Sequence, residues 1–147
     1  MAAIKITPHF HDASKGLIPI VENSNFRIYE ETDHTSDNDT SRYLRAGAKK
    51  SYFIQTTDAF LKESLKLASV LLDPDLPFLV ESTELRHLLV PELFVFIQGS
   101  DSVDKPLAIE MRQLADATVF SDGEEFSLDP GYVYFHKFWK IDEPIFA

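Results

Sequence analysis

Three short segments of this chain hold side chains that could bind a metal ion or a phosphate group. The first contains His9 and His11. On an extended segment these two imidazoles point to the same side, because successive side chains of a strand alternate. A metal site normally needs three or four ligands, and Asp12 is the only acidic residue nearby in the sequence. We therefore favour the simpler interpretation, a solvated turn after Pro8.

The second segment contains Asp39 and Arg42, at the end of a polar stretch over residues 30–41 that we expect to be a loop. The carboxylate of Asp39 could hold Mg²⁺, a hard ion that takes oxygen ligands and shares them with phosphate and water. The guanidinium of Arg42 could contact that phosphate or form an ion pair with Asp39. We interpret the neighbouring Asp33 and Asp37 as solvated loop residues.

The third segment ends at Glu81, which follows the apolar residues 78–80. This run predicts an internal strand, and open α/β sheets bind ligands at the carboxyl ends of their strands. Because an unpaired carboxylate is costly at the end of a buried strand, Glu81 needs a partner, a metal ion or water. The alternative is a capping role at a short helix that Ser82 and Glu84 open.

Composition limits the class of protein. The length of 147 residues predicts a single domain over residues 1–147. A net charge of −10 opposes the binding of phosphate backbones, which argues against nucleic acid as a partner. No apolar run approaches the roughly 18 residues of a membrane span, and the first residues lack the pattern of a secretory signal. Without cysteine there is no disulfide or thiolate metal site. We expect a soluble, cytoplasmic protein.

Strand-like and helix-like segments alternate along the chain. Predicted helices run from residue 57 to about residue 72 and from Pro106 toward residue 114. The continuous apolar run at residues 93–97 is typical of a strand covered on both faces. This alternation predicts an α/β fold with three layers and a mostly parallel sheet. The main predicted strands cover residues 4–7, 52–55, 78–80, 93–97, 117–120 and 131–139.

Three motifs in the first third of the chain occur in an order found in one protein family. Residues 4–11 form a strand with a terminal cluster of Lys and His, residues 39–42 read Asp-Thr-Ser-Arg, and residues 46–48 read Ala-Gly-Ala. Together they resemble the P-loop adaptor protein family of molybdopterin-guanine dinucleotide biosynthesis, whose Asp-Ser-x-Arg block lacks the additional Thr. The resemblance extends over residues 4–122 as an order of short motifs. Gly47 is expected to serve backbone geometry.

The resemblance implies a site for GTP or ATP with Mg²⁺. Glu81 falls where the family has an acidic residue at a strand end, and a later strand end, which faces the base, corresponds to Ser121 and Asp122. The family assists a guanylyltransferase in completing the molybdenum cofactor, so such an enzyme is the implied partner. By this resemblance Mg²⁺ would be held by Asp39 and Glu81, and the nucleotide would contact His9, His11, Arg42, Ser121 and Asp122.

The Gly-rich phosphate loop of that family does not occur in this sequence. None of the five glycines belongs to a G-x-x-x-x-G-K-[ST] segment, and only Met1, Ala2 and Ala3 precede the first predicted strand. We therefore expect a P-loop NTPase-like domain without the first strand, the phosphate loop and the first helix. Nucleotide binding then depends on a phosphate loop located upstream, and hydrolysis is not expected. Whether the protein is an enzyme stays open.

A protein-interaction module is the alternative function. The strand that is missing is central to the family's sheet, and its loss would leave unpaired strand edges, which a soluble protein must cover. Such a module would pair through its open sheet edge with a second copy of itself or with a partner protein, and it would have no catalytic activity.

Overall fold

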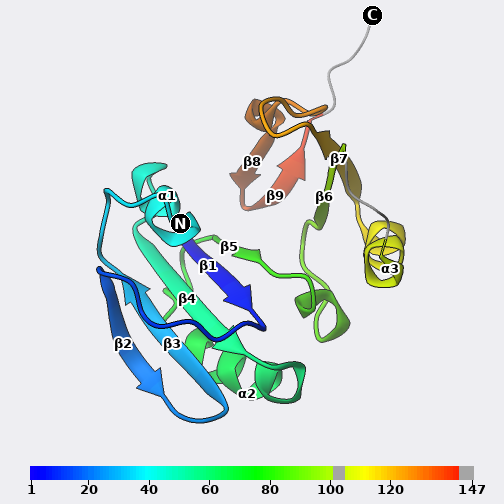
Figure 1. Ribbon diagram of the computed structural model, residues 1–147. Coiled ribbons are helices and arrows are strands. Elements are labelled where there is room, and N and C mark those ends of the chain that lie inside the picture. Colours follow the sequence, from blue (N-terminus) through cyan, green and yellow to red (C-terminus); the bar gives the residue numbers. More distant parts are fainter. Residues whose placement is uncertain (101–104, 143–147) are drawn as a thin grey trace, which may run out of the picture. The chain divides into compact units, whose positions relative to one another are not determined.

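The computed structural model describes residues 1–100 and 105–142, which belong to two compact units (Figure 1). Unit 1 comprises Met1–Leu88 and unit 2 comprises Leu89–Ala147. The described residues form three α-helices, one five-stranded sheet and two small sheets. The α/β class expected from the sequence is confirmed, while the single domain over residues 1–147 stays a prediction.

Unit 1 is built on a mixed five-stranded sheet. Its strands are β1 (Ala2–Thr7), β2 (Leu17–Glu22), β3 (Phe26–Glu31), β4 (Lys50–Thr56) and β5 (Phe78–Glu81). They lie in the order β2-β3-β4-β1-β5. β1 pairs in parallel with β4 and β5, whereas β3 pairs antiparallel with β2 and β4. β5 is therefore an edge strand, and the prediction of an internal strand before Glu81 is wrong, because a short apolar run does not specify how many neighbours a strand has.

One face of this sheet is covered by α2 (Asp58–Ser69). Leu61 and Ala68 of the helix pack with Ile4 of β1 and Ile54 of β4 in the main core of the unit. The helix starts where the sequence predicts, and it ends a little before the predicted end near residue 72. Single turns follow it, in which each amide donates to the carbonyl three residues earlier.

The opposite face of the sheet carries the start of α1 (Asp39–Arg45). Lys5 of β1 and Phe53 of β4 are paired in register and alternate with the core residues Ile4 and Ile54. They therefore point away from α2, toward the face on which α1 begins. Unit 1 thus has a helix on each face of its sheet, and α1 brings polar side chains over the carboxyl half of β1.

The Ala-Gly-Ala segment terminates α1. Gly47 has a φ of 100°, in the left-handed region that glycine adopts without steric cost. Its amide donates to the carbonyl of Leu44 at 3.0 Å, and the amide of Ala48 donates to the carbonyl of Tyr43 at 3.0 Å. The prediction that Gly47 serves backbone geometry is confirmed.

Unit 2 begins with a strand, a helix and a second strand: β6 (Val95–Gly99), α3 (Pro106–Leu114) and β7 (Ala117–Ser121). β6 and β7 pair in parallel as a two-stranded sheet. The helix opens with Pro106, as predicted. Ile97 of β6 is 59% exposed, so the prediction that this strand is covered on both faces is wrong. A sheet of two strands leaves apolar side chains of both strands in solvent, including Phe120.

The last part of unit 2 is a hairpin. The sequence predicts one strand over residues 131–139, but the structure has two antiparallel strands, β8 (Val133–His136) and β9 (Phe138–Ile141). Lys137 between them has a φ of 65°, the left-handed conformation that reverses the chain. A lysine at such a position gives no turn signal, so the sequence alone predicts one continuous strand here and the structure corrects it.

Candidate functional site

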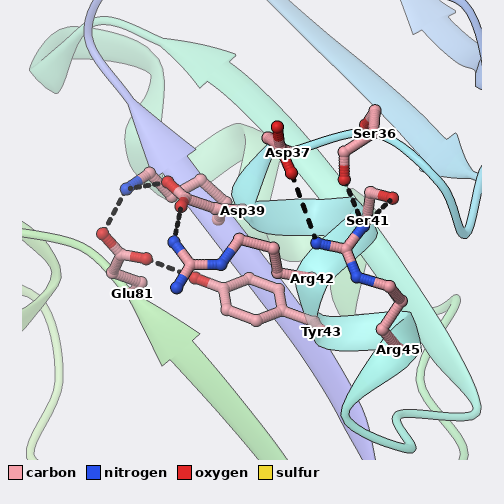
Figure 2. Close-up of polar contacts among 9 residues, drawn as sticks. Ser36, Asp37, Asp39, Ser41, Arg42, Tyr43, Arg45 and Glu81 are labelled. Carbon is pink, nitrogen blue, oxygen red and sulfur yellow. Dashed lines mark hydrogen bonds and ion pairs between the residues drawn. The ribbon is translucent and has the colours of Figure 1, made fainter.

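A lysine and two carboxylates meet at the carboxyl ends of β1 and β5 (Figure 2). Lys5 lies near the end of β1, Asp39 is the first residue of α1, and Glu81 is the last residue of β5. Nζ of Lys5 lies 3.1 Å from Oδ2 of Asp39 and donates a hydrogen bond to Oε1 of Glu81. The structure therefore brings together the two predicted metal ligands, and it does so around a lysine.

The second oxygen of each carboxylate has a partner of its own. Nη1 of Arg42 lies 3.8 Å from Oδ1 of Asp39, and the hydroxyl of Tyr43 donates to Oε2 of Glu81. Both partners belong to α1, as Figure 2 shows. We call these five residues, Lys5, Asp39, Arg42, Tyr43 and Glu81, the Lys5 cluster. Each carboxylate in it thus has two partners: Lys5 of β1 and one residue of α1.

The cluster keeps its lysine charged and its tyrosine neutral. Burial by itself lowers the pKa of Lys5, but the hydrogen bonds and charges of Glu81 and Asp39 outweigh it, so the pKa of Lys5 is raised. Burial, followed by the hydrogen bond to Glu81, raises the pKa of Tyr43 well above its usual range. At neutral pH, Lys5 is therefore an ammonium group and Tyr43 is a hydrogen-bond donor.

Solvent reaches the carboxylates. The side chain of Glu81 is 52% exposed and that of Asp39 is 45% exposed, whereas Lys5 is 23% exposed. Glu81 is accessible because β5 lies at the edge of the sheet, so the burial expected for it from the sequence is wrong. The sequence predicts that Glu81 needs a partner, a metal ion or water, and in the structure Lys5 is a partner of this carboxylate.

A depression of about 460 Å³ lies beside the cluster, within unit 1. Lys5, Thr7 and Phe53 line it from the strands. Two loops add further polar side chains, among them His11 and Asp12 from the loop after β1. The remaining lining residues are Ser14, Leu17, Asp37, Asn38, Asp39 and Thr40. Most of the lining residues are thus polar or charged, and Leu17 and Phe53 are the apolar ones.

Negative charge predominates in the depression. Asp12, Asp37 and Asp39 face one lysine, Lys5, and the imidazole of His11. Such a field repels a bare phosphate group and attracts a cation. A phosphorylated ligand would therefore fit this depression best together with a divalent cation.

The polar loop before α1 is held by a buried carboxylate. Glu31 at the end of β3 is buried, and its Oε1 accepts hydrogen bonds from the amides of Thr32 at 3.0 Å and Asp33 at 2.9 Å. Its Oε2 accepts from the hydroxyl of Thr40 at 2.8 Å. Since Thr40 follows Asp39, Glu31 anchors the start of α1 and with it one carboxylate of the Lys5 cluster.

Arg45 holds the same loop from the other end of α1 (Figure 2). Its guanidinium donates to the carbonyl of Ser36 and lies 3.8 Å from a carboxylate oxygen of Asp37. Asn38 donates to the hydroxyl of Ser14 at 3.0 Å, which joins the loop to the segment after β1. The prediction of a loop over residues 30–41 is wrong at both ends, because Glu30 and Glu31 belong to β3 and residues 39–41 belong to α1, and the contacts above hold the connecting residues 32–38 in a defined conformation.

The two predicted histidines have different surroundings. His11 lines the depression, whereas His9 does not, although the two rings lie 6.2 Å apart. The carbonyl of His11 accepts hydrogen bonds from Gln55 at 3.1 Å and from Arg27 at 3.3 Å. These bonds fix the backbone of the loop at His11, beside the depression that this residue lines.

Ser121 and Asp122 lie in unit 2, where Ser121 is the last residue of β7 and Asp122 begins the turn that follows. Oδ1 of Asp122 accepts from the amides of Glu124 at 2.9 Å and Glu125 at 2.8 Å, and these bonds lower the pKa of Asp122. The hydroxyl of Ser121 accepts from the amide of Gly123 at 3.1 Å. Their role in contacting a nucleotide stays a prediction.

Within residues 1–100 and 105–142, no group of three or more His, Cys, Asp or Glu side chains could hold a metal ion. Asp39 and Glu81 supply only two carboxylates, and Mg²⁺ needs phosphate and water to complete such a set, so their role as metal ligands stays a prediction. Two members of the cluster, Lys5 and Tyr43, were not predicted as site residues. A signal existed for both: Lys5 is a charge among apolar strand residues, and Tyr43 lies one helical turn after Asp39.

Comparison of the chain with protein-family models, with curated protein sequences and with solved structures found no match. Among the helices that the structure describes, none is long and apolar enough to cross a membrane.

Proposed function

We propose that the protein is a P-loop-like, nucleotide-binding accessory protein related to molybdenum cofactor guanylylation, which does not hydrolyse its nucleotide. The observation that carries this proposal is the Lys5 cluster at the carboxyl ends of two adjacent parallel strands, β1 and β5. This is the end of a parallel sheet at which open α/β folds bind their ligands. The resemblance of the sequence to the adaptor family suggests GTP as the nucleotide and a guanylyltransferase as the partner.

The chemistry of the site supports a nucleotide that arrives with Mg²⁺. Mg²⁺ is commonly bound by one or two carboxylates together with phosphate oxygens, and Asp39 and Glu81 supply two carboxylates. Lys5 and Arg42 are the cations nearest to them that could contact phosphate. The sequence has no phosphate loop, so firm binding requires such a loop from outside these residues, and turnover is not expected.

Thermal unfolding in the presence of nucleotide tests this proposal. A ligand that binds the folded state raises its stability, by about 2.7 kcal/mol at a hundredfold excess over Kd. We expect millimolar GTP or ATP with Mg²⁺ to raise the Tm and the Glu81→Gln variant to lose that rise. Glu30→Gln is the matched control, because Glu30 pairs with Lys50 away from the depression. No rise in Tm with either nucleotide, or Mg²⁺-dependent hydrolysis that Glu81→Gln abolishes, would overturn the proposal.

The edge of the sheet supports a second candidate function, a non-catalytic interaction module. Within the described part of the chain β5 pairs only with β1. Its residues Phe78 and Leu79, which point to opposite faces of the strand, are 49% and 41% exposed. Strands in parallel arrangement are normally covered on both faces, and an open apolar edge is a template for a further strand. Pairing of β5 with a second copy or with a partner protein would cover this edge.

The oligomeric state distinguishes the two candidates. An interaction module should run as a dimer or larger species on a sizing column, and its Tm should not change with GTP or ATP. We expect Leu79→Lys to shift such a species to the monomer, whereas Val70→Lys, a control at an exposed residue after α2, should not. A monomer at all concentrations tested, with no partner that Leu79→Lys releases, would exclude pairing through β5.

A further inference from the structure

The ammonium group of Lys5 occupies the place at which the two predicted metal ligands meet. Nζ lies 3.1 Å from Oδ2 of Asp39 and binds Oε1 of Glu81, one oxygen from each carboxylate. Because the other oxygen of each carboxylate faces Arg42 or Tyr43, a Mg²⁺ ion bound between the two carboxylates would use the two oxygens that Lys5 contacts. It would also lie within a few ångströms of a positive charge, and the repulsion between the two is strong at that distance.

We propose that Lys5 acts as a built-in competitor for Mg²⁺ and keeps the bare ion out until an anionic group of the ligand draws Lys5 away. This inference rests on the proposed function, since the anionic group is the phosphate of the nucleotide. In this arrangement Lys5 exchanges Asp39 and Glu81 for phosphate, while Mg²⁺ takes the two carboxylates. Metal and nucleotide then bind together, and neither binds well alone.

The remaining contacts of the cluster keep the carboxylates in place when Lys5 moves. Arg42 lies at Oδ1 of Asp39 and Tyr43 donates to Oε2 of Glu81, so each carboxylate keeps one partner on the oxygen that Lys5 does not contact. Lys5 itself lines the depression of about 460 Å³, which offers its flexible side chain room to move. The two oxygens that face Lys5 are therefore held in position for a cation of either kind.

Removal of the competing charge provides the test. We expect Lys5→Met to bind Mg²⁺ in the absence of nucleotide at least tenfold more tightly than the wild type, measured by isothermal titration calorimetry with MgCl₂. Mg²⁺ should also raise the Tm of Lys5→Met and leave that of the wild type unchanged. Lys50→Met is the matched control, because it removes the same charge from a pair with a single carboxylate, Glu30. It should show no gain in Mg²⁺ affinity.

Two further variants make the result decisive. Adding Glu81→Gln to Lys5→Met should abolish the gain, since one of the two carboxylates is lost. If Lys5→Met folds only when MgCl₂ is present, as followed by circular dichroism, that dependence supports the proposal. If it does not fold in either buffer, Lys5→Gln, which keeps an amide donor beside the carboxylates, is measured in its place. Equal Mg²⁺ affinity of the folded variant and the wild type would overturn the proposal.

The absence of nucleotide from this experiment separates the two hypotheses. If Mg²⁺ with GTP or ATP leaves the Tm of the wild type unchanged, the proposed function is wrong, whatever the Mg²⁺ affinity of Lys5→Met. If the wild type binds Mg²⁺ without nucleotide as tightly as Lys5→Met does, Lys5 does not compete with Mg²⁺, even if the nucleotide binds.

Discussion

Tyr43 of α1 donates its phenolic hydrogen to Glu81, the last residue of β5. The same carboxylate accepts a hydrogen bond from Lys5 of β1, so a helix and two strands meet at one side chain. Among the residues that the structure describes, β5 pairs with β1 alone. The bond from Tyr43 links this edge strand to α1 independently of strand pairing. The Tyr43–Glu81 bond therefore couples the edge of the sheet to the candidate site.

Removing this hydroxyl should weaken unit 1 modestly. A hydrogen bond to a charged group contributes about 1.5–3 kcal/mol when protected, and the exposure of Glu81 reduces that, so we expect Tyr43→Phe to cost about 1 kcal/mol of unfolding free energy in urea. Tyr132→Phe, at an exposed tyrosine of unit 2, should be neutral. An equal cost for both variants would argue against a role of the Tyr43–Glu81 bond in stability.

The raised pKa of Tyr43 predicts a pH dependence on the alkaline side. Its phenol keeps its proton in the folded state after the phenol of the unfolded chain has lost it, so its contribution to stability is complete below pH about 10 and is lost as the pH rises further. The ionisation of Tyr43, measured as the difference in tyrosinate absorbance between wild type and Tyr43→Phe, should appear only at or near the pH of alkaline unfolding. In the Glu81→Gln background, which lacks the carboxylate acceptor, Tyr43 should ionise at a lower pH. Ionisation of Tyr43 at pH about 10 in the folded protein would contradict this.

Two glycines with the same φ of 100° should differ in their tolerance of alanine. A Cβ at Gly16 would collide with the side chains of Glu31 and Asp33, whereas a Cβ at Gly47 would meet no atom within 4 Å. We expect Gly47→Ala to cost about 1–2 kcal/mol, the strain of the left-handed backbone alone. Gly16→Ala should cost at least about 1 kcal/mol more, because the buried Glu31 must shift. Thermal or urea unfolding measures both, and equal costs would rule out the close packing at Gly16.

Glu31 should matter far more than its neighbour Glu30. Glu31→Ala leaves two backbone amides and the Thr40 hydroxyl without their acceptor, and we expect it to cost roughly 2–4 kcal/mol. Glu30→Ala removes a surface ion pair with Lys50 and should cost less than about 1 kcal/mol. Hydrogen exchange should also show faster exchange of the amides of Thr32 and Asp33 in Glu31→Ala. Unchanged exchange there would mean that Glu31 does not hold the loop.

Local sequence patterns predicted the elements with a local cause. α3 begins at Pro106 because proline suits the first helical turn, and β1 ends before Pro8, which cannot donate to a neighbouring strand. Gly47 ends α1 through a left-handed backbone that the Ala-Gly-Ala motif allows. The hairpin turn at Lys137 has no such local signal, because lysine does not mark a left-handed position in a sequence.

The composition of the candidate site was visible in the sequence, but its connections were not. Asp39, Arg42 and Glu81 could be selected because carboxylates and guanidinium groups suit Mg²⁺ and phosphate wherever the fold places them. That Lys5 joins the two carboxylates was decided by the tertiary structure, because Lys5 and Glu81 are 76 residues apart and meet only through the pairing of β1 with β5.

Local patterns in the sequence predict α2, α3 and the strands β1, β4, β5, β6 and β7, and they offer Asp39, Arg42 and Glu81 as candidate site residues, because propensity, capping and charge depend on the residue and its near neighbours. The tertiary structure alone decided that β5 lies at the edge of its sheet, that Glu81 is exposed there, and that an ammonium group stands between two carboxylates. These properties depend on which distant strands pair, and pairing depends on the free energy of the whole fold rather than on any local pattern.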